Sequence, residues 1–115
     1  MKRIIILIFM LYLLTITYVA SAHPPTKMNV HFKPASKILA ATITHPVQNV
    51  RTHFIQKVSV KRRGKKIIEH TLSKQDNNKT QTVSFLIPDA QPGDLFEMEA
   101  YCNISGRRTK RIQFE

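Results

Sequence analysis

Three histidines and the only cysteine of the chain are the residues whose types could bind a transition metal. His45 and His53 stand at the predicted end of one strand and the predicted start of the next, and His23 precedes the first strand. Cys102 closes a predicted strand and is followed by a tight turn. Imidazole nitrogen and thiolate sulfur are ligands of iron, copper and zinc. These four residues are therefore the candidate ligands, although a single such histidine is more often a surface residue and a single buried cysteine a small apolar core residue.

Other kinds of active site find little support in the sequence. It has no nucleophile elbow, no glycine-rich phosphate loop and no His-Glu-x-x-His motif. Only 7 residues are acidic, which leaves little for a mechanism that needs two carboxylates. The other two histidines are interpreted as structural or solvent-exposed: His31 lies on a polar strand face, and His70 lies in the middle of a predicted strand.

Residues 1–22 have the composition of a secretory signal peptide. A basic start is followed by an apolar run from Ile4 to Leu14 and by the small residues Ala20-Ser21-Ala22, where cleavage is expected. This predicts a periplasmic or secreted protein. The alternative is an uncleaved signal anchor, because the apolar stretch approaches the ~20 residues that span a bilayer.

Length and charge narrow the class of the remaining chain. The 115 residues include 18 Lys plus Arg, and removing the first 22 residues leaves 93 with 16 basic and 7 acidic side chains, enough for one domain. One cysteine excludes a disulfide framework within the chain. In an exported protein the positive charge favours anionic lipid or envelope polymer over nucleic acid as a contact, and a well-solvated charged surface is the simplest reading.

The mature chain has the pattern of an all-β domain. Short runs of alternating apolar and polar residues are separated by turn residues, with a charged hairpin turn at 62–65 and a polar loop at 73–79. The expected strands cover residues 27–32, 38–44, 53–61, 66–72, 80–87, 95–102 and 107–114. About seven short strands favour an immunoglobulin-like β-sandwich, with a small closed barrel as the alternative.

The order of motifs resembles a known family. The segments are His45-Pro46, His53-Phe54-Ile55, the charged hairpin, and Tyr101-Cys102-Asn103-Ile104-Ser105-Gly106. This order is similar to that of the iron-binding domain of desulfoferrodoxin and superoxide reductase, and the resemblance covers residues 23–115. It implies an immunoglobulin-like sandwich and a mononuclear iron held by four histidines in a plane and one axial cysteine thiolate, which reduces superoxide to peroxide.

The resemblance assigns ligands residue by residue. It makes His23, His45 and His53 equatorial ligands and Cys102 the axial one, but the fourth histidine position holds Ser105, a poor ligand for iron. The interval between His45 and His53 is also longer than in the family, and the family's Glu-Lys pair before the first ligand is replaced by the end of the signal peptide. If cleavage makes His23 the N-terminus, its amine could supply a further ligand in a copper-type arrangement.

Three functions remain open at this point. The first is an exported iron-binding oxidoreductase that resembles superoxide reductase, with superoxide as substrate, an unidentified electron donor, and Lys27, Lys33 and Arg51 near the ligand segments to attract the anion. The second is a metal-free immunoglobulin-like module that binds anionic envelope polymer through basic strands at 57–66 and 107–111. The third is a periplasmic copper- or zinc-binding protein that uses His23.

Overall fold

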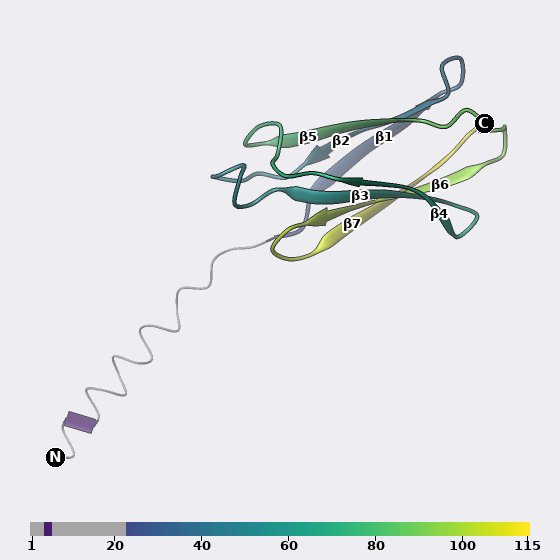
Figure 1. Ribbon diagram of the computed structural model, residues 1–115. Helices are drawn as coiled ribbons and strands as arrows, with labels where there is room; N and C mark the ends of the chain where they lie inside the picture. Colours follow the sequence, from purple (N-terminus) through teal and green to yellow (C-terminus); the bar gives the residue numbers. More distant parts are fainter. Residues whose placement is uncertain (1–3, 6–22) are drawn as a thin grey trace.

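The computed structural model describes residues 4–5 and 23–115 (Figure 1). The predicted signal peptide lies outside this range apart from residues 4–5, so its cleavage and the location of the protein stay predictions. Within the described residues, no helix is both long enough and apolar enough to cross a membrane.

Two antiparallel sheets form a β-sandwich, which confirms the predicted all-β fold (Figure 1). One sheet has the strand order β1-β2-β5 and the other the order β4-β3-β6-β7, and the two stay separate, so the closed barrel is wrong. The strands are β1 (Lys27–Lys33), β2 (Ile38–Thr44), β3 (Ile55–Arg62), β4 (Lys65–Thr71), β5 (Thr80–Leu86), β6 (Leu95–Cys102) and β7 (Arg107–Gln113).

The predicted strand bounds hold to within one residue except at the start of β3. That strand begins at Ile55 rather than at His53, because the amide of His53 bonds the carbonyl of Asn49 at 3.0 Å in a turn. At the other end of β3, Arg63 and Gly64 have φ of 55° and 76°. Positive φ at both central residues is what a two-residue hairpin needs.

The core lies between the sheets and follows the alternation of the sequence. Leu39 and Ile43 of β2 face Phe96 and Met98 of β6, and all four are completely buried. Replacing one such side chain by alanine typically costs about 2–5 kcal/mol. This packing holds the strand ends, and therefore the candidate ligands, in fixed positions.

The register brings the ends of strands from both sheets together at one end of the sandwich. Lys27 of β1 pairs with Thr44 of β2, and Ile55 of β3 pairs with Cys102 of β6. The β2–β3, β4–β5 and β6–β7 connections therefore gather at this end, where the chain also enters at His23 (Figure 1). We call it the histidine end, and the opposite one the far end. Lys33 pairs with Ile38 at the far end, about 20 Å along the strand from Lys27, so the expectation that Lys33 lies near the ligands is wrong.

Candidate metal centre

Three of the four predicted ligands meet at the histidine end. His23 precedes β1, His45 directly follows β2, and His53 closes the turn before β3. One ring nitrogen from each lies within 4.8 Å of those of the other two, and the ring centroids are 4.7, 4.9 and 5.0 Å apart. The three imidazoles are thus close enough together to hold one metal ion.

His45 is completely buried because it continues the inward alternation of β2 by one residue. Its amide bonds the carbonyl of Lys79, which extends the pairing with the chain before β5. The ring Nδ1 lies 2.8 Å from Oε1 of Gln75, and Nε2 lies 3.1 Å from the carbonyl oxygen of His23. A buried polar side chain requires such partners. The sequence predicts only that Gln75 lies in a polar loop. Nothing in the sequence indicates that its side chain contacts a histidine.

His53 has a ring nitrogen with no partner. Its Nε2 is buried and makes no hydrogen bond, and it is the only such side-chain atom in the part of the chain that the structure describes. The pKa of His53 is lowered, first by desolvation and then by the neighbouring charges of His45 and His23, with a smaller opposing effect of the His23 backbone. The neutral form is therefore favoured, and its free lone pair is suited to a metal.

His23 is held by the polypeptide backbone. Its Nε2 lies 2.8 Å from the carbonyl oxygen of Pro46 and its Nδ1 lies 3.0 Å from that of Pro24. Pro25 is fully buried, and the amide of Thr26 donates to the carbonyl oxygen of Thr44. The N-terminal segment is therefore anchored where it brings the half-buried ring against the other two.

Cys102 lies beside the three histidines without joining their cluster. It is 8% exposed, ends β6 opposite Ile55, and its Sγ accepts a hydrogen bond from the amide of Ile104 at 3.5 Å. The group of ligand atoms within 4.8 Å of one another contains the histidines and not this sulfur. Ser105, at the position of the family's fourth histidine, is exposed.

Asn103 fixes the turn that carries His53. Its Oδ1 accepts the amide of Phe54 at 2.8 Å, its Nδ2 donates to the carbonyl of Thr52 at 3.0 Å, and its own amide bonds the carbonyl of Phe54. Both chain neighbours of His53 are thus bound to one residue of the β6–β7 turn. The sequence placed Asn103 in a tight turn and in the family motif, but gave no sign of this contact.

Gly106 brings the same turn against the N-terminal segment. It has a φ of +83°, and a Cβ added there would lie 2.7 Å from Cβ of Pro24. The absence of a side chain permits this close approach. The residue next to His23 therefore packs directly on the turn that follows Cys102.

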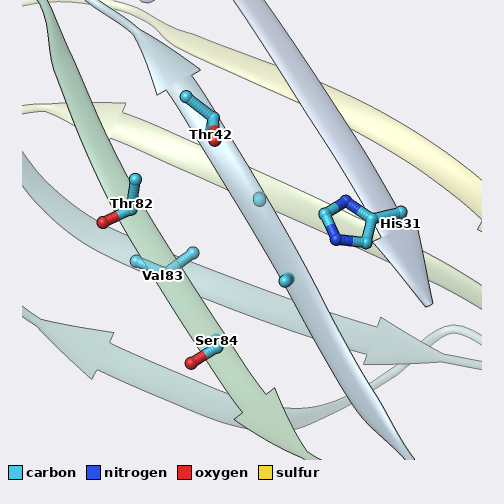
Figure 2. A pocket seen from close by; sticks show the side chains of 7 residues that line it. His31, Thr42, Thr82, Val83 and Ser84 are labelled. Atoms are coloured by element: carbon cyan, nitrogen blue, oxygen red, sulfur yellow. The ribbon is translucent and has the colours of Figure 1, made fainter. Parts of the chain in front are cut away.

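The two other histidines of the sandwich lie away from this centre. His31 and His70 are exposed, as expected. Figure 2 shows Thr42 on the strand between His31 and the pair Thr82 and Ser84, and these residues line a shallow pocket on the β1-β2-β5 sheet. A single imidazole among hydroxyl groups lacks the several strong ligands that hold a transition metal.

Some of the basic side chains are paired with acidic groups. Arg107 bonds Glu99 at 3.0 Å, and Arg111 lies 3.4 Å from Glu97, all on the outer face of the larger sheet. Lys57 lies over the ring of Tyr101. Binding of an anionic envelope polymer through these strands stays a prediction.

Comparisons with protein-family models and with curated proteins find no match. The functional argument therefore depends on the residues themselves. Three imidazoles converge, one of them has a buried unpartnered nitrogen, and the thiol of Cys102 lies at the end of β6. The three histidines lie close enough together to hold a metal ion.

Proposed function

We propose that the protein binds a single transition-metal ion through His23, His45 and His53. The observation that carries this proposal is the buried Nε2 of His53, which has no hydrogen-bond partner and belongs to a ring packed against two other imidazoles. Leaving a buried nitrogen unpaired costs about 1–3 kcal/mol, and a bound cation offsets this cost.

We further propose an iron centre that acts on superoxide, in line with the family resemblance, with Cys102 as the fourth ligand. Bound ferrous iron would supply one electron to superoxide, which with two protons from water leaves as hydrogen peroxide, and an external one-electron donor restores the ferrous state. The protein residues orient the imidazoles and shield the thiol. Arg51, Lys74 and Lys79 outnumber Asp76 in the two loops between the sheets at this end, and their field favours the approach of an anion.

Anaerobic loading with Fe²⁺ tests both parts of this proposal. We expect one iron per chain, a thiolate-to-metal charge-transfer band in the oxidised form, and superoxide consumption with added reductant. Cys102→Ala should lose the band, and His70→Ala, which changes an exposed histidine, should keep it. A protein that retains no stoichiometric metal of any kind would contradict the binding proposal, and a metal-loaded protein without the band would contradict the thiolate ligand.

A second candidate, a copper- or zinc-binding protein without superoxide chemistry, is favoured by the shape of the cluster. The three ring separations are nearly equal, whereas three positions of a square plane include one opposite pair that is farther apart. Cys102 also stands outside the cluster. Three imidazoles at mutually adjacent positions suit a tetrahedral zinc or copper ion with an open fourth position. Competition among Fe²⁺, Zn²⁺ and Cu⁺ for the purified protein separates the two candidates.

We also propose that the chain is exported and cleaved after Ala22, which gives His23 a free amine beside its ring. That amine would add a nitrogen ligand in place of the histidine that Ser105 replaces. Intact mass of the protein from a native-like export host should match residues 23–115. Acetylation of the N-terminus should then weaken copper binding, and a full-length mass would contradict cleavage.

A further inference from the structure

Gln75 is a buried amide in a loop of otherwise exposed side chains. It lies in the β4–β5 connection, is completely buried, and its neighbours Lys74 and Asp76 are exposed. Its amide N–H bonds the carbonyl of Val50 in the β2–β3 loop at 3.0 Å. The residue therefore ties together two loops of the histidine end.

The hydrogen bonds of Gln75 fix which way its side chain faces. Nε2 donates to the carbonyl oxygens of His45 at 2.8 Å and of Asn77 at 2.9 Å, which uses both of its hydrogens. Oε1 then faces Nδ1 of His45 at 2.8 Å. The reverse orientation would place an oxygen against two carbonyl oxygens, so the amide oxygen can only accept a hydrogen bond from the ring.

We infer that Gln75 is a positioning residue that holds His45 in the tautomer with the proton on Nδ1, so that Nε2 is the metal-binding atom. The same amide binds the ring and the backbone carbonyl of His45, which fixes both the rotation of the ring and its protonation. Outer partners of metal-binding histidines act in this way. The role of Gln75 in metal binding rests on the proposed metal site. The tautomer of His45 is argued from the hydrogen bonds alone and does not depend on that proposal.

The surroundings of Nε2 agree with this role. In this tautomer the nitrogen has no hydrogen, yet it lies 3.1 Å from the carbonyl oxygen of His23, so two lone pairs face each other. A cation bound by Nε2 removes this repulsion once the carbonyl of His23 moves aside or binds the same cation. Gln75 thus favours the tautomer in which Nε2 has a lone pair, against the competing acceptor on His23.

Nitrogen-15 NMR of the metal-free protein at pH 8 tests the tautomer directly, because free imidazole is neutral there. We expect wild-type His45 to carry its proton on Nδ1. Gln75→Met removes both the acceptor for Nδ1 and the donors to the carbonyls, and it should give a mixture of tautomers. The matched control is Gln81→Met, because Gln81 is also buried nearby but bonds only Asp76 and Thr82.

Zinc titration of the same proteins tests the consequence. Gln75→Met should weaken Zn²⁺ binding by about 10–100-fold, and Gln81→Met should leave it within about twofold of wild type. The inference would be overturned if wild-type His45 carries its proton on Nε2. It would also be overturned if Gln75→Met has the same tautomer and the same zinc affinity as wild type. The wild-type spectrum tests the tautomer even if Gln75→Met fails to fold. A wild type with the Nδ1 proton but no affinity for any metal would instead confirm the tautomer and overturn the proposed metal site.

Discussion

The two ends of the sandwich are closed by opposite kinds of contact. At the far end, Arg62 bonds Asp89 at 2.8 Å and also approaches the buried carboxylate of Asp94, so ion pairs join the β3–β4 hairpin to the β5–β6 connection. At the histidine end the corresponding contacts are neutral amides, from Gln75 and Asn103. A carboxylate beside the three rings would favour protonated imidazoles. Neutral contacts order the loops without placing a negative charge beside the rings, and Nε2 of His53 is left without a partner.

Substitution of His53, which carries the unpartnered nitrogen, should have the largest effect on metal affinity. His53→Ala removes a proposed ligand, so metal affinity should fall by more than about 100-fold, beyond the 10–100-fold typical for loss of an outer partner. The metal-free protein should lose mainly the packing of the half-buried ring against His23 and His45, because Nε2 makes no hydrogen bond that is lost. Isothermal titration with Zn²⁺ and urea unfolding measure the two quantities.

His70→Ala is the matched control for that comparison. His70 is exposed and lies in β4, outside the cluster, so affinity should stay near the wild-type value, while loss of its ring contact with Phe85 should cost about 0.5–1.5 kcal/mol of stability. Equal losses of affinity in the two variants would remove the case for a site at the histidine end.

The next largest effect is expected at the amide that holds the turn of His53. Asn103→Ala removes two side-chain hydrogen bonds, worth about 2 kcal/mol together, and frees the turn, so metal affinity should also fall by about 10–100-fold. Asn78→Ala removes one exposed hydrogen bond of 3.3 Å to the carbonyl of Gln48, and it should leave both stability and metal affinity near the wild-type values. If Asn103→Ala lowers stability but leaves affinity unchanged, the turn is structural only.

A smaller effect is expected from alanine substitutions at two glycines, one at each end of the sandwich. Gly106 and Gly64 have φ of +83° and +76°, so alanine costs about 1 kcal/mol of strain at either position. A Cβ at Gly64 meets nothing within 4 Å, whereas one at Gly106 would clash with Pro24. Gly106→Ala should therefore cost about 1–3 kcal/mol more than Gly64→Ala and also weaken metal binding, by displacing His23. Equal unfolding energies in the two variants would contradict the close approach to Pro24.

These residues also show what the sequence could and could not predict. The strict alternation in β2 and β6 predicted both strands to the residue, and strand ends predicted that His45 and His53 would meet. His53 and Phe54 fitted the alternation of β3 but belong to a turn, because the deciding bond comes from the backbone of Asn49. Gln75 could not be found, since a polar side chain in a loop has the same sequence pattern whether it faces water or a buried ring.

The smallest expected effect is the pH dependence that His53 adds to stability. Its pKa in the folded protein lies below the ordinary value of 6.5, so the unfolded chain takes up a proton more readily. This contribution is complete above pH 6.5 and is lost as the pH falls from 6.5 towards the lower folded pKa. Urea unfolding of the metal-free protein at pH 7.5, 6.5 and 5.5 should show a steeper loss in wild type than in His53→Gln. No ion pair at the far end changes in that variant. Identical slopes would therefore mean that the packed imidazoles do not disfavour a proton on His53. Protons would then compete with a metal at His53 as strongly as they do at an exposed histidine.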